Sequence, residues 1–168
     1  KIHTFTGSAT FTVNAVGNAA GSETVDYLVI AGGGSGSTAN SGAGGAGGYR
    51  FSNGTASGCY SAGPSPLGAA ALPVAAQGYP ITVGGGASPT TANPGFRVNG
   101  ANGSNSVFSS ITSSGGGAGS SNPSAKVGVA GGSGGGSGYT APGGGGSGTG
   151  AGGAGNTPPV SPPQGFAG

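Results

Sequence analysis

Charged residues are scarce in this chain of 168 residues, and their scarcity excludes several classes of protein. They make up 4% of the sequence, and the formal net charge is +2. Because so few charges form no basic patch, we expect no nucleic-acid partner. A single Cys cannot form a disulfide within the chain. No run of about 18 apolar residues occurs, so we expect no insertion into a membrane.

Large apolar side chains are also few, with no Trp and no Met. A conventional core must therefore be small, and we expect one cluster near the N-terminus. Phe51 and Phe108 alternate within apolar strands, so we expect them to form a small core that caps the ends of the glycine-rich part. Alternating residues over 2–6 and 11–13 predict a hairpin. Further predicted strands, rich in β-branched and aromatic residues, cover residues 25–30, 49–51, 79–83 and 106–112. Residues 66–77 have room for one helical turn before Pro73 interrupts it.

Glycine is abundant instead, with 45 residues. Within residues 32–48, 115–119 and 131–155 it recurs at every third position. This period matches neither the α-helix, at about 3.6 residues, nor a strand. It is the period of the polyproline II helix, whose backbone groups stay free to pair with neighbours, and glycine lets such backbones approach closely. The glycine pattern therefore predicts a bundle of polyglycine II helices.

The predicted fold is thus mainly irregular and β. A region of short β-strands over residues 1–30 precedes a polyglycine II bundle with loops over residues 31–168, and we expect the chain to be part of a longer protein. Two alternatives remain open for the glycine runs, a flexible linker and a silk-like flat sheet. A collagen helix is disfavoured because the G-X-Y register breaks every few residues.

The motifs for catalysis and cofactors lack the context that they require. Residues 34–39 and 42–47 fit a dinucleotide fingerprint, but no acidic residue follows Asp26, and no helix is expected after the glycines. His3, Cys59, Asp26 and Glu23 form no cluster with the spacing of a metal site, and no nucleophile elbow is present. We expect Asp26 to face solvent or to pair with Arg50. The sequence therefore predicts no catalytic residue, no metal and no cofactor.

Surface recognition is the remaining chemistry. Aromatic and arginine side chains in loops are frequent binding anchors. Tyr79 is also a loop candidate, although it can equally join Phe51 and Phe108 in the core. The predicted receptor-binding residues are Tyr60, Phe96, Arg97 and Tyr139.

Several blocks of the sequence, in order, resemble a known family. They include Val-Asp-Tyr-Leu-Val-Ile-Ala-Gly-Gly-Gly over residues 25–34 and Asn-Thr-Pro-Pro-Val-Ser-Pro-Pro-Gln-Gly over residues 156–165. The other blocks cover residues 10–13, 44–50, 79–84 and 105–111. Together they are similar to the glycine-rich domain of phage tail-fibre and tail-tip proteins from marine phages and cyanophages. The Ala- and Pro-containing insert at residues 57–77 departs from this pattern.

The resemblance implies a structural and adhesive module without enzymatic activity, located at the tail fibre or tail tip of a virion. Its loops would contact a bacterial surface polysaccharide or an outer-membrane protein, and its other partners would be tail proteins, including further copies in a trimer. The alternative is a structural extracellular or filament protein that associates only with itself. An ice-binding protein is a third hypothesis, but the sequence lacks the regular Thr rows that it would need.

Overall fold

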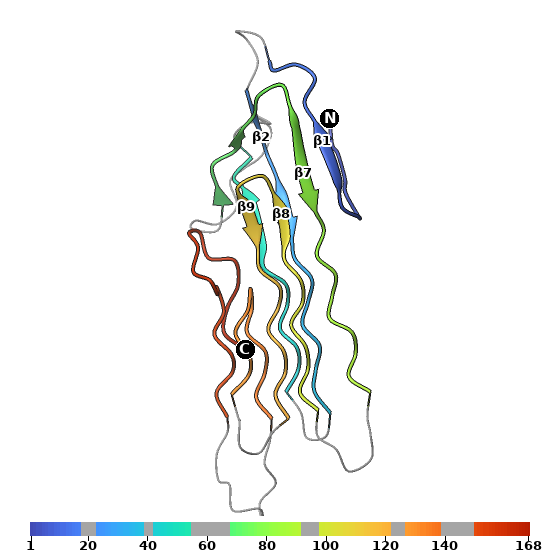
Figure 1. The fold of residues 1–168 in the computed structure, drawn as a ribbon. Helices are drawn as coiled ribbons and strands as arrows, with labels where there is room; N and C mark the ends of the chain where they lie inside the picture. The colour runs from blue at the N-terminus through green and yellow to red at the C-terminus, as the bar shows by residue number, and fades with distance from the viewer. Residues whose placement is uncertain (18–22, 39–41, 55–67, 92–97, 122–126, 139–149) are drawn as a thin grey trace, which may run out of the picture.

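The computed structural model describes residues 1–17, 23–38, 42–54, 68–91, 98–121, 127–138 and 150–168. The molecule is elongated (Figure 1). Short β-strands occupy one end, which we call the β end, and extended glycine-rich segments run side by side from there to the other end. The N-terminus lies at the β end, whereas the C-terminus lies among the glycine-rich segments.

Nine strands form three small sheets in the described part of the chain. Four of them make an antiparallel sheet in the order β1 (Ala9–Thr12), β7 (Gly78–Thr82), β8 (Ser106–Phe108) and β9 (Ile111–Ser113). A second sheet pairs β3 (Leu28–Ile30) antiparallel with β4 (Tyr49–Ser52), which also pairs parallel with β5 (Gly68–Ala69). The third joins β2 (Thr24–Val25) to β6 (Leu72–Pro73).

The hydrophobic core lies at the β end, where β3 packs against β8 and β9. Its buried members are Val29, Tyr79, Phe108 and Ile111. The ring of Phe108 lies edge-on to that of Tyr79, with 6.2 Å between centroids. This confirms the core assignment of Phe108 and places Tyr79 in the core as well. Phe51 is half-buried, and its ring lies beside that of Tyr49 instead, with 5.3 Å between centroids and an angle of 58° between the ring planes.

Three of the glycine-rich segments are direct continuations of strands. Residues 31–38 follow β3, residues 83–91 follow β7, and residues 114–121 follow β9. Neighbouring segments are joined by one backbone hydrogen bond every three residues. Thus the N–H groups of Ala31, Gly34 and Ser37 donate to Gly48, Gly45 and Gly42, while those of Gly32, Ser35 and Thr38 donate to Ser104, Ala101 and Val98.

Residues 114–121, which we call the central segment, are buried along their whole length. Each of their N–H groups donates to a partner. Two face residues 31–38, from Gly116 to Gly32 and from Gly119 to Ser35, and two face residues 132–138, from Gly117 to Ser133 and from Ser120 to Gly136. The other four bind side-chain oxygens, from Gly115 to Asn105, Ala118 to Asn102, Ser121 to Asn99 and Ser114 to Gln164. The segment therefore carries no unpaired backbone donor in the interior.

Close backbone approach explains the glycine content of this region. A Cβ atom added to Gly116 would overlap the carbonyl oxygen of Gly45. At the surface the constraint disappears, because a Cβ at Gly85 would meet no atom within 4 Å. Glycine is thus required where segments pack on several sides, since any side chain would push the hydrogen-bonded backbones apart.

The predicted bundle of polyglycine II helices is wrong. No described residue is helical, and the regular secondary structure consists of three small sheets. The hydrogen bonds of the glycine-rich segments do run between neighbouring segments, as the glycine pattern led us to expect, but outside the strands the described glycine-rich segments are extended chains without regular secondary structure. The three-residue spacing of glycine corresponds to the spacing of these bonds. The repeat of three in the sequence therefore reflects hydrogen bonds between segments. We had interpreted this repeat as the period of a helix.

Several strand predictions are confirmed and others are corrected. The strands expected at residues 49–51 and 79–83 are present as β4 and β7. The hairpin expected within residues 2–13 is not formed, because residues 2–6 contain no strand and β1 pairs with β7 instead. The strand expected over 106–112 is a hairpin that turns at Ser109, where φ is 53°. Residues 68–77 hold β5 and β6 in place of the expected helical turn.

Candidate functional site

The glycine-rich segments stop together at the end of the molecule opposite the β end, and we call this the distal end (Figure 1). It includes Thr38, Gly42, Val98, Ser121 and Gly138. These residues border the ranges 39–41, 92–97, 122–126 and 139–149, which lie outside the described residues. They come from parts of the chain up to 100 positions apart, from 38 to 138. The topology thus gathers the starts and ends of several connections in one place.

Hydrogen bonds fix the described residues of the distal end. Thr38 donates its N–H to the carbonyl of Val98 at 3.0 Å, and its Oγ1 accepts the N–H of Val98 at 2.9 Å. Gly42 donates to Ser120 at 3.0 Å. The N–H of Ser121 donates to Oδ1 of Asn99 at 2.9 Å. Residues 39–41 are therefore anchored at both bases, Thr38 and Gly42, and hydrogen bonds hold one base each of residues 92–97 and 122–126, at Val98 and Ser121.

The four predicted receptor-binding residues all lie outside the described residues. Phe96 and Arg97 belong to residues 92–97, and Tyr139 begins residues 139–149; both ranges are flanked by described residues of the distal end. Tyr60 belongs to residues 55–67, which are flanked by Gly54, after β4, and by Gly68 in β5. The flanks of three candidates thus meet at the distal end, and those of Tyr60 lie at the β end.

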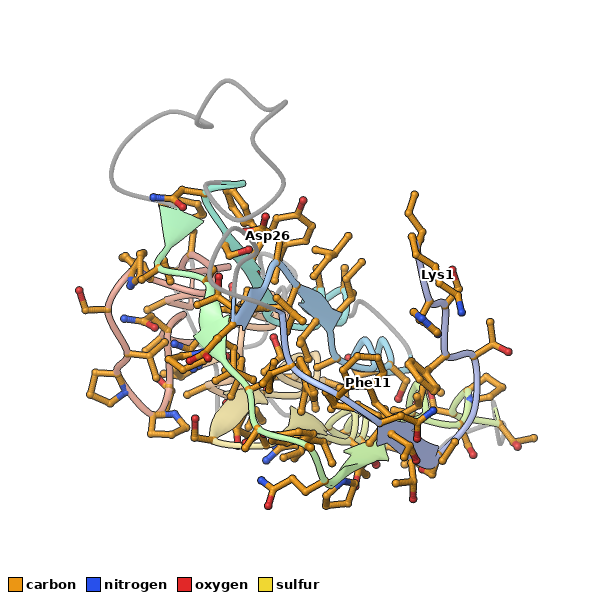
Figure 2. All side chains as sticks on the ribbon, turned by 90° about the horizontal axis from the view of Figure 1, so that it is seen from above. Lys1, Phe11 and Asp26 are labelled. Atoms are coloured by element: carbon orange, nitrogen blue, oxygen red, sulfur yellow. The ribbon has the colours of Figure 1, made fainter. Side chains whose placement is uncertain are left out.

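The charged side chains of the described residues belong to the β end. They are Lys1, Glu23, Asp26 and Arg50. Figure 2, which looks down on the molecule, labels Lys1, Phe11 and Asp26. The described residues of the distal end carry no charged side chain.

Asp26 takes part in a local structural bridge. Its Oδ1 accepts a hydrogen bond from Oγ of Ser52 at 2.7 Å, and that Oγ accepts the N–H of Tyr27 at 2.9 Å. Arg50 donates from Nη1 to the carbonyl of Thr112 at 3.4 Å. Burial raises the pKa of Tyr27, and the positive charge of Arg50 offsets part of that rise. These polar groups tie β3, β4 and β9 together.

All glycines of the apparent dinucleotide fingerprints except Gly36 are used in close packing; a Cβ at Gly36 would come no closer than 3.5 Å to its neighbours. A Cβ at Gly34, Gly42, Gly44 or Gly47 would overlap a backbone carbonyl of a neighbouring segment, so these glycines offer no open cradle for a phosphate. Among the described residues no group of three His, Cys, Asp or Glu side chains is placed to hold a metal. His3 packs edge-on against Phe11 at 5.3 Å. A search of the same residues finds no helix that could span a membrane.

Residues 5–168 match a family model described as a glycine-rich domain. The chain belongs to this family. The match includes both the strands of the β end and all the glycine-rich segments, so the glycine-rich domain comprises the whole elongated unit. Searches of curated proteins and of solved structures find no match to this glycine-rich domain.

The polar residues that organise the domain were not predicted from the sequence. Asn99, Asn102 and Asn105 recur at every third position, the same period as glycine, and this repeat was a usable signal. Gln164 gave no such signal. It is 2% exposed, accepts the N–H of Ser114 at 2.8 Å and donates from Nε2 to the carbonyl of Pro158 at 3.1 Å. It thereby joins the proline-containing C-terminal turn to the start of the central segment.

Proposed function

We propose that this glycine-rich domain is a structural and adhesive module of a phage tail fibre or tail tip. The observation that supports the proposal is the distal end, where hydrogen-bonded segments bring the bases of several connections together. Connections that emerge from one rigid end are a common arrangement for surface recognition, because loops carry binding residues and a rigid scaffold positions them.

The scaffold also suits exchange of its connections. Its packing depends on backbone hydrogen bonds and on glycine contacts, and both join one described segment to another. A new loop sequence therefore leaves the packing unchanged as long as its two ends stay in place. This property favours a module that adapts to different bacterial surfaces.

In this proposal Phe96, Arg97 and Tyr139 contact the receptor, a cell-surface polysaccharide or an outer-membrane protein. Tyr60, whose flanking residues lie at the β end, is a receptor residue only if the β end also reaches the cell. The domain acts on the virion, without enzymatic activity or cofactor, beside other tail proteins and in a trimer of its own chain.

Cell binding tests the proposal. The labelled domain is incubated with a panel of cyanobacterial and marine bacterial cells, together with the variant F96A/R97A/Y139A and with Y60A. We expect strain-selective binding that the triple substitution abolishes and that Y60A leaves largely intact. If well-folded protein binds no strain of the panel, the receptor role is overturned.

A second candidate function is assembly through self-association, and one surface favours it. Leu28, Ile30 and Tyr49 are 56%, 55% and 49% exposed. The register pairs Ile30 with Tyr49 and Leu28 with Phe51, so these apolar side chains share the outward face of β3 and β4. Light scattering tests this function, since association between copies through this face should be lost in L28S/I30S. A wild-type domain that stays monomeric at high concentration contradicts it.

A further inference from the structure

Asn99, Asn102 and Asn105 form a line along residues 98–105, which we call the asparagine row. All three side chains are exposed. Each nevertheless uses Oδ1 to accept a backbone N–H of the buried central segment, from Ser121, Ala118 and Gly115 at 2.9, 2.8 and 2.8 Å. The three amides therefore share one orientation, which the interior of the molecule imposes on them.

This orientation decides what each amide offers to solvent. Because Oδ1 is bound to the central segment, the NH2 group on the other arm of the same planar amide is left for other partners, and the three residues are exposed. Nδ2 of these three residues has no partner among the described residues, and it can donate two hydrogen bonds. The row thus presents three sets of outward donors that are already fixed before any ligand arrives.

The spacing of the row is regular. Three residues of extended chain span about 9–10 Å, so the amides repeat at that interval. The residues between them are Gly100, Ala101, Gly103 and Ser104, all of them small. The adjoining described residues, 83–91 and 98–105, carry no charged side chain. The surface is therefore extended and uncharged, with only small side chains between the amides and hydrogen-bond donors at a constant interval.

We propose that the asparagine row binds an extended, neutral, β(1→4)-linked polysaccharide along the side of the domain. Successive sugars of such a chain face opposite sides, so its hydroxyl or acetamido oxygens recur on one side at every second sugar. That repeat is similar in length to the repeat of the row. Donors that are fixed in advance lose little conformational freedom on binding, which favours recognition of a polymer by repeated weak contacts.

This binding surface is distinct from the distal end. It is built from residues along the length of a segment, whereas the proposed receptor contacts of Phe96, Arg97 and Tyr139 belong to connections at the tip. The two proposals can therefore fail separately. Loss of cell binding in F96A/R97A/Y139A does not predict loss of oligosaccharide binding along the row, and the converse also holds.

The test uses N99D/N102D/N105D. Aspartate keeps an oxygen that can accept the N–H of the central segment, but it has no NH2 group, so the donors are removed while the scaffold is retained. The control A43D/A46D/A151D adds the same charge at three exposed alanines outside the row. The probes are soluble β(1→4)-linked hexasaccharides of glucose and of N-acetylglucosamine, and binding is measured by titration calorimetry.

We expect the wild-type domain and the control to bind at least one hexasaccharide with similar affinity, and the row variant to bind at least about tenfold more weakly, as the loss of three neutral hydrogen bonds implies. Circular dichroism confirms that the row variant is folded. The proposal is overturned if the wild-type domain binds neither hexasaccharide, or if control and row variant lose affinity equally.

Discussion

Asn102 shows how one side-chain oxygen can take the place of a backbone carbonyl as a hydrogen-bond acceptor. Its Oδ1 accepts the N–H of Ala118, a residue that is 2% exposed. The substitution N102A leaves that donor buried without an acceptor, and we expect a loss of about 1–3 kcal/mol in the free energy of unfolding. Urea denaturation measures this loss.

Two further variants make the test specific. N102D keeps an acceptor and should lose less stability than N102A, while S104A removes an exposed hydroxyl of the same segment and should have little effect. Equal destabilisation by N102A and N102D would show that the acceptor oxygen is not what stabilises the central segment.

Tyr27 gives the domain a pH dependence in the alkaline range. Burial holds its folded pKa above the ordinary value of about 10, because the phenolate loses hydration, and Arg50 offsets part of this effect. The unfolded chain therefore releases this proton at lower pH than the folded protein. The stabilisation is complete below about pH 10 and is lost as the pH rises through the folded pKa.

The variant Y27F isolates this contribution, since all other groups titrate equally in both proteins. The difference in melting temperature between wild type and Y27F should be constant from neutral pH to about pH 10. Above that pH, the melting temperature of the wild type should fall relative to that of Y27F. Thermal melts by circular dichroism measure the difference. A difference that does not change above that pH contradicts the assignment.

At the scale of elements, the glycines of one segment are not equivalent. A Cβ at Gly116 would overlap the carbonyl oxygen of Gly45 inside the packed segments, whereas one at Gly85 would extend into open space. We expect G116A to lower the free energy of unfolding by about 3 kcal/mol or more, at the upper end of overpacking effects. Chemical denaturation of the purified variants measures the loss.

The matched control is G85A. Its backbone is compatible with alanine, because its φ does not lie in the left-handed region, so its stability should be unchanged or raised by up to about 1 kcal/mol. If the two variants have the same stability, close backbone packing is not the reason for glycine at Gly116.

The sequence identified some elements well and others poorly, for a physical reason. Residues 49–51 and 79–83 were predicted as strands because β-branched and aromatic side chains favour the extended chain locally. The pairing of β1 with β7 depends on residues about 70 positions apart in the chain, and no local pattern encodes it. Glycine has no side chain, so its runs revealed a period without revealing their conformation or their neighbours.

The candidate sites show the same limit. Phe108 could be assigned to the core from its strand context, and the structure confirms it. The common orientation of Asn99, Asn102 and Asn105 depends on the central segment beside them, which the sequence alone does not place. Tyr60 and Tyr139 were grouped as loop residues, but only the topology shows that their flanking residues lie at opposite ends.

At the scale of the whole molecule, the β end and the glycine-rich part are joined without a break, because segments of the second continue strands of the first. The central segment leaves β9 directly, and residues 31–38 leave β3 in the same way. The register of a strand therefore sets the register of the segment that continues it. Since the core at the β end holds those strands together, we expect the two parts to unfold as one cooperative unit.

The variant F108A tests this cooperativity because Phe108 lies in the core, away from the central segment's own contacts. Removal of a buried Phe side chain costs about 3–5 kcal/mol. Native-state hydrogen exchange should show the protection of the Gly117 and Gly119 amides falling by the same free energy as global stability. The control I2A changes a side chain that is 92% exposed and should leave exchange unaltered. If those amides keep their full protection in F108A, the glycine-rich segments are a separate unit whose backbone bonds suffice for stability, and the strands serve only to attach them.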